Sequence, residues 1–106
     1  MEHVIFHPAA IGELGDVIAA APQADQWLIR SDLRLLNEFG ESFFALVEVG
    51  DEAHLVECWM RRELTYVVVM QRRKTSQLYV LAMCCVDVGE PERYLALERA
   101  RARRYP

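Results

Sequence analysis

Apolar and polar positions follow a helical period in the first part of this chain. After Pro8, which suits the first turn of a helix, apolar residues recur at intervals of three, three and one as far as about Ala21. From Gln23 to Phe39 they form a wide stripe opposite charged residues, and Gly40 follows where a glycine commonly ends a helix. The short gap at Pro22 predicts that the two helices form an antiparallel hairpin.

The remaining apolar runs have the length and composition of strands. A short run at residues 4–6 precedes the first helix, and residues 42–49 are mostly apolar and end in a turn. Three longer runs rich in Val, Tyr, Cys and Leu follow, with short connections that predict an antiparallel meander. The third is apolar on both faces, as an interior strand would be. These runs cover residues 54–60, 64–70 and 78–88, and a last helix begins at Pro91 and continues to about Arg104.

This order, β-α-α-β-β-β-α, predicts one α+β domain over residues 1–106, with the helical hairpin packed on a small, mainly antiparallel sheet. The 106 residues are 53% hydrophobic, which is enough for a packed core. The longest near-apolar run has eleven residues, short of the ~20 that span a bilayer. No secretory signal is recognisable at the N-terminus, so we expect a cytoplasmic protein that does not enter a membrane.

Charge is distributed unevenly between the two halves. Residues 1–53 carry ten acidic and two basic side chains, whereas residues 54–106 carry ten basic and six acidic ones. The basic half predicts a surface for nucleic acid or an acidic partner. Helix-end preference and solubility would explain the same residues, and the acidic hairpin could instead attract a cationic partner. The predicted binding residues are Arg72, Arg73, Lys74, Arg101, Arg103 and Arg104.

Other chemistry-bearing side chains fit structural positions. The three cysteines have no metal-ligand spacing, and we expect buried, reduced thiols and no metal or cofactor. Adjacent Cys84 and Cys85 would point to opposite faces of a strand. We expect Glu57 to face solvent from its strand. The large aromatic residues are expected in the core, namely Trp27, Trp59, Tyr66 and Tyr79.

Several stretches resemble the RelE/ParE toxin superfamily, above all its phage-derived, HigB-like branch. These stretches are residues 6–8 before the first helix, the leucine-rich residues 35–40, residues 46–50 and 54–57, and, in the last helix, residue 91 with residues 95–100. The resemblance covers nearly the whole chain and implies a RelE-like fold. It also implies the toxin of a type II toxin–antitoxin system, a metal-independent endonuclease that cleaves messenger RNA on the ribosome and binds a cognate antitoxin.

Site residues of such a nuclease would be cations that activate a ribose hydroxyl and stabilise the phosphorane. Arg61 and Arg62 at a hairpin tip and His54 at a strand start are the candidates, since imidazole titrates near neutrality. Positions where the family carries cations hold neutral or acidic residues here, at 58–59, 66–67 and 86–88. A second hypothesis is therefore a catalytically inactive, phage- or prophage-derived RelE-fold protein that binds and modulates a protein partner.

Overall fold

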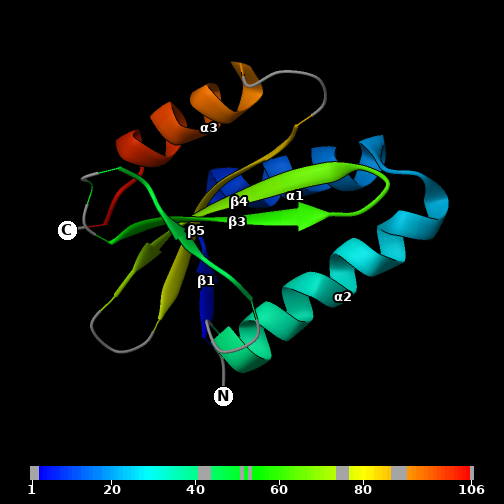
Figure 1. Cartoon of the computed structure of the whole chain (residues 1–106), viewed down its shortest axis with the longest axis horizontal. Helices are drawn as coiled ribbons and strands as arrows, with labels where there is room; N and C mark the ends of the chain where they lie inside the picture. The colour runs from blue at the N-terminus through cyan, green and yellow to red at the C-terminus, as the bar shows by residue number, and fades with distance from the viewer. Residues whose placement is uncertain are drawn as a thin grey trace.

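The computed structural model describes residues 3–40, 44–50, 52, 54–73, 77–86 and 91–105. In this described part of the chain, three helices and five strands follow one another in the order expected from the sequence, with one short strand added (Figure 1). The strands are β1 (Val4–Phe6), β2 (Val47–Glu48), β3 (Leu55–Arg61), β4 (Thr65–Arg72) and β5 (Leu78–Cys85). The helices are α1 (Pro8–Ala20), α2 (Gln23–Phe39) and α3 (Pro91–Ala102).

The strands form one mixed sheet in the order β1-β5-β4-β3-β2. The meander of β3, β4 and β5 is antiparallel as expected, and β1 adds a parallel edge next to β5. β5 is therefore an interior strand, which confirms the expectation from its two apolar faces. Near its middle, Val69 pairs with Ala82 but Met70 pairs with Val80, so that Leu81 forms a bulge.

The helices cover the two faces of the sheet. The α1–α2 hairpin packs on one face, where Val56, Val68 and Val80 meet Val17 and Leu36 of the helices. On the other face Ala96, Leu97 and Ala100 of α3 pack against residues of β3, β4 and β5. In Figure 1, α3 and α2 lie on opposite sides of the strands. None of the helices in the described part of the chain is long and apolar enough to cross a membrane.

Two boundaries differ from the sequence pattern. In the apolar stretch at 42–49, the structure has only the two-residue β2, both residues exposed, which pairs with Val56 and Glu57 of β3. β5 ends at Cys85, and the predicted continuation to residue 88 falls mostly outside the described residues. Because β2 is so short, β3 has no neighbour on its outer edge beyond Glu57 among the described strands.

Candidate functional site

The three residues predicted to be catalytic lie at opposite ends of β3. Arg61 ends the strand and pairs with Thr65, whereas His54 precedes Leu55 at its other end. Seven residues of extended chain place these ends roughly 20 Å apart. His54 adopts a positive φ of 72°, and its carbonyl accepts the Arg72 amide at 2.7 Å. The fold thus groups Arg61 with Arg62 and separates both from His54.

Arg62 is held by a buried carboxylate on α2. Its Nε donates to Oδ2 of Asp32 at 3.0 Å, and its Nη2 pairs with the other oxygen. The hydroxyl of Tyr66 donates to the same Oδ2 at 3.0 Å. Hydrogen bonding to Asp32 raises the pKa of Arg62, while burial raises the pKa of the Tyr66 hydroxyl. With Asp32 only 3% exposed, this group of side chains joins helix to sheet.

A second buried acid, Asp25, binds the turn between β3 and β4. The amide of Leu64 donates to Oδ2 of Asp25 at 3.1 Å, and Asp25 is 5% exposed. The turn between β3 and β4 is thereby bound at two points to α2. Asp25 and Asp32 therefore do not belong to an acidic outer surface of the hairpin.

The basic residues near the C-terminus are paired with carboxylates. Arg103 forms two bonds to Glu13 of α1, at 2.9 and 3.0 Å, and donates to the Leu81 carbonyl at 2.8 Å. Arg101 binds Glu52 at 2.6 Å, and Arg104 pairs with the same carboxylate. These side chains serve contacts within the molecule.

Two of the predicted binding residues near the β4–β5 connection, Arg72 and Arg73, also contact other side chains of the fold. Arg72 pairs with Glu48 of β2 at 3.2 Å, and the Arg73 guanidinium lies 5.2 Å from the ring centroid of Tyr79. Lys74 lies outside the described residues. Arg72 and Arg73 share a sheet end with His54, opposite to the end that carries Arg61.

A cluster of aromatic and arginine side chains joins β3 to α3. The Nε and Nη2 of Arg93 each donate to a carboxylate oxygen of Glu57 at 2.8 Å. Glu57 was expected to face solvent and is only 2% exposed. Arg93 and Arg61 each lie 5.9 Å from the ring centroid of Trp59, and Arg93 lies 5.6 Å from that of Tyr94. Glu57 is buried because α3 covers its face and supplies a cation from 36 residues away.

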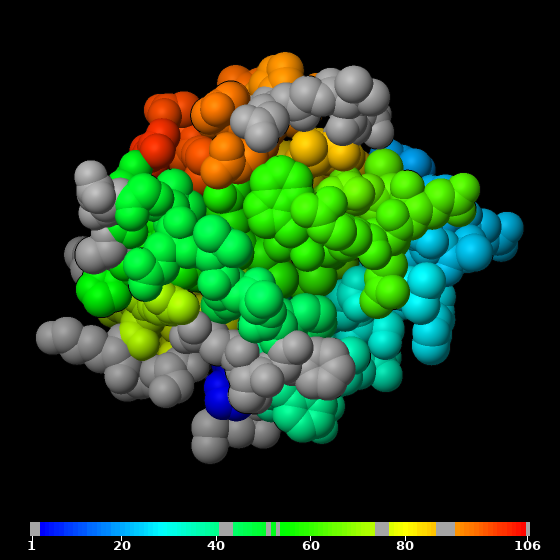
Figure 2. Space-filling view, in the orientation of Figure 1, coloured from blue at the N-terminus to red at the C-terminus, as the bar shows by residue number. Residues whose placement is uncertain are grey.

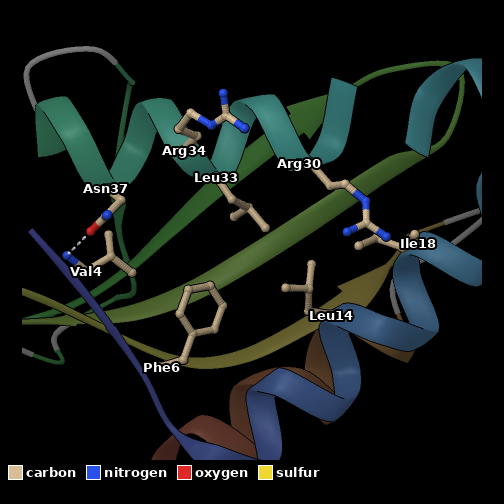
Figure 3. Close-up of a pocket in the computed structure, with 8 residues that line it drawn as sticks. All are labelled: Val4, Phe6, Leu14, Ile18, Arg30, Leu33, Arg34 and Asn37. Atoms are coloured by element: carbon tan, nitrogen blue, oxygen red, sulfur yellow. Dashed lines mark hydrogen bonds between the residues drawn. The ribbon is translucent and has the colours of Figure 1, made fainter. Parts of the chain in front are cut away.

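A pocket of about 380 Å³ opens between α1, α2 and β1 (Figure 3). Its walls are mostly aliphatic, and Arg30, Arg34 and Asn37 are the polar side chains that line it. The Oδ1 of Asn37 accepts the Val4 amide at 3.0 Å. The apolar lining residues are Val4, Phe6, Leu14, Ile18 and Leu33.

Sequence reasoning missed this pocket, but one signal was available. Arg30 and Arg34 are the two basic residues of the first 53, and they stand four residues apart on an otherwise apolar and acidic helix. Trp27, one turn earlier, was expected in the core and is 70% exposed. Its position on the outer side of α2 corrects that expectation.

The cysteines have the features of structural thiols. Burial raises the pKa of Cys58 and of Cys84 to about 11, which keeps both protonated at neutral pH. Cys84 packs on the α3 side of the sheet and Cys85 on the hairpin side, as adjacent strand residues should. Cys84 and Cys85 are half-buried, not fully buried as expected. In the described part of the chain no group of His, Cys, Asp or Glu could hold a metal ion.

No family model, no curated protein and no solved structure matches this chain.

Proposed function

We propose that this protein is a non-catalytic binding protein, the second of the two hypotheses raised by the likeness to RelE/HigB toxins. It would act by binding and modulating a protein partner. The alternative, a ribosome-dependent messenger-RNA endonuclease controlled by an antitoxin, draws its support from the sequence likeness and the α+β element order.

The observation that carries the proposal is the engagement of the cations. A nuclease without a metal needs several charged donors aimed at one developing oxyanion. Here Arg62 is bound to Asp32, Arg103 to Glu13, and Arg101 to Glu52. A guanidinium paired with a carboxylate has its charge compensated and part of its N–H donors occupied, so it offers less charge and fewer hydrogen bonds to a phosphate. The basic half of the sequence therefore contributes to cohesion of the fold.

The separation of the candidate catalytic groups points the same way. General acid–base chemistry requires groups within hydrogen-bond reach of one reacting centre. His54 and Arg61 stand at the two ends of β3, and no single scissile phosphate reaches both.

A surface suited to a protein partner lies over the sheet edge. Trp59, Arg61, Arg93 and Tyr94 cluster there, and side chains of these types dominate binding energy in protein interfaces. Tyr94 and Leu95 are each 56% exposed. In Figure 2 the green strands remain partly uncovered between α3 in orange and α2 in cyan. A partner segment could pack on this surface beside the open outer edge of β3.

The test is controlled expression in a bacterial host, with growth followed and messenger-RNA 5′ ends mapped. The proposal expects continued growth and intact messages while folded, soluble protein accumulates. Arg61→Ala and His54→Ala should change nothing in this assay, because neither residue contributes to cleavage.

The proposal would be contradicted if the wild-type chain arrested growth and produced new messenger-RNA ends, and if Arg61→Ala or His54→Ala abolished the arrest and the new ends. Arg73→Ala serves as the matched control for Arg61→Ala, because each removes a guanidinium that lies over an aromatic ring. For the binding surface, the double variant Trp59→Ala, Tyr94→Ala should lose any partner that co-purifies with the wild-type chain.

A further inference from the structure

The pocket between α1 and α2 combines an apolar floor with cationic side chains at its mouth. Leu14 and Ile18 stand one helical turn apart on α1, and Leu33 faces them from α2. Val4 and Phe6 of the edge strand β1 form the floor. In Figure 3 the Arg30 side chain extends from α2 toward Ile18, while the Arg34 guanidinium, one turn further along, lies over α2 itself.

The polar side chains of this pocket are mainly hydrogen-bond donors. Arg30 and Arg34 carry no acceptor, and the Asn37 oxygen already accepts the Val4 amide, while its amide nitrogen is a donor. Among the described residues, the lining contains no carboxylate. Another hollow, between α1 and the end of β5, differs in this respect, since Glu13, Asp16 and Glu92 line it. A ligand of the first pocket must therefore supply acceptors.

Arg30 and Arg34 are also the cations that the fold leaves unused. Within the described ranges, every other arginine has a carboxylate or an aromatic ring as partner, and these two have neither. Four residues apart on a helix, their like charges repel each other. An anion between them would relieve this repulsion and accept charge-assisted hydrogen bonds from both.

We propose that this pocket binds a medium-chain fatty acid. The carboxylate would lie between Arg30 and Arg34, and the alkyl chain would run along Leu14, Ile18 and Phe6. The volume, about 380 Å³, falls at the lower end of the range for small-molecule sites, ~300–1,000 Å³. From Arg30 to Asn37 the helix advances roughly 10 Å, which suits a chain of medium length. Aliphatic walls and a paired cationic mouth match the two parts of such a molecule.

The experiment titrates decanoate, below its micelle concentration, into the purified full chain and follows binding by calorimetry. Methyl resonances of Leu14, Ile18 and Leu33 report contact with the alkyl chain by nuclear Overhauser effects. We expect saturable binding of one molecule per chain, with contacts to these methyl groups. Decanol, which lacks the charge, should bind at least tenfold more weakly.

Variants separate the two halves of the site. Arg30→Gln with Arg34→Gln should weaken decanoate at least tenfold and leave decanol unchanged, whereas Arg61→Gln with Arg73→Gln removes equal charge elsewhere and should have no effect. Ile18→Trp, which fills the pocket from a half-buried position, should abolish both. Circular dichroism confirms that each variant is folded.

Three results would overturn the proposal. One is the absence of saturable decanoate binding to the folded wild-type chain. Another is equal loss of affinity in the Arg30/Arg34 and Arg61/Arg73 variants, which would indicate general charge attraction. The third is a dimer that dissociates in the Arg30→Gln, Arg34→Gln variant but persists when decanoate is added to the wild type. That result would show that a second copy of the chain occupies the pocket.

Discussion

Arg62 and Asp32, thirty residues apart in the sequence, form a bond of 3.0 Å between Nε and Oδ2 that joins the β3–β4 turn to the middle of α2. The side chain of Asp32 is 4% exposed and that of Arg62 35%, so the anion is buried and the cation covers it from the surface. An arginine beside a hairpin tip thus serves as the counter-ion of a core acid.

Replacing Arg62 by Ala should therefore lower the free energy of unfolding by about 2 kcal/mol. Breaking a buried pair costs ~3–5 kcal/mol, and partial exposure of Arg62 reduces that cost. Arg61→Ala, at the neighbouring exposed position, should change it by about 0.5 kcal/mol, the value of an exposed ring contact. Urea denaturation measures both, and equal losses in the two variants would refute the structural role of Arg62.

The Glu57–Arg93 pair should behave as a unit. Arg93→Ala leaves a carboxylate that is 2% exposed without its cation and should cost about 3 kcal/mol. Replacing both residues by Met keeps the volume and removes the buried charge, so the double variant should be more stable than Arg93→Ala alone. Thermal unfolding at one pH compares the three proteins. A double variant less stable than Arg93→Ala would show that an unpaired buried charge is not the cause of the stability lost in Arg93→Ala.

Glu13 should protect from association the part of β5 that extends beyond its pairing with β1, residues 81–85. Its Oε1 accepts the Met83 amide at 3.1 Å, and Arg103, bound to the same carboxylate, covers the Leu81 carbonyl. Glu13→Ala frees backbone groups that a second chain could pair with. We expect loss of about 1–3 kcal/mol of stability and self-association that rises with concentration in sedimentation experiments. Asp16 is exposed on the same helix, and Asp16→Ala should show the same degree of self-association as the wild type.

Alkaline pH should destabilise the protein through its buried thiols. The pKa of Cys58 in the folded chain is about 11, above that of the unfolded thiol. Above pH ~8.5 the unfolded chain therefore loses its proton first, and the free energy of unfolding falls as pH rises toward 11. The slope reaches up to about 1.4 kcal/mol per pH unit for each such thiol. Urea denaturation between pH 8 and 9.5 should give a shallower slope for Cys58→Ala than for wild type, and identical slopes would contradict this reading.

Local patterns were enough to predict the helices and the meander. The spacing of apolar residues is a local signal, and so are the helix start at Pro8 and the helix end at Gly40. Accordingly, α1 and α2 have the expected bounds. The parallel pairing of β1 with β5 joins Val4 to Leu78, a distance in sequence that no local period encodes. The same holds for Glu13 and Arg103, ninety residues apart.

A finer reading of α2 could have found part of the site. Asp25 and Asp32 fall on the same helical face as Ile29, Leu33 and Leu36, all of which are buried. An acid on an apolar stripe implies a polar partner packed against it, here the Leu64 amide and the Arg62 guanidinium. The pocket itself depends on how α1 and α2 are placed over β1, which follows from packing and not from the period of either helix.

The measurement that tests the central claim most directly is messenger-RNA cleavage by the purified chain on programmed ribosomes. Folded protein, verified by its cooperative unfolding, is incubated with ribosomes carrying a labelled message, and the products are separated by length. The engagement of the cations and the separation of His54 from Arg61 predict an intact message at every protein concentration. Site-specific cleavage that Arg61→Ala or His54→Ala removes without loss of stability would show instead that the protein is a nuclease.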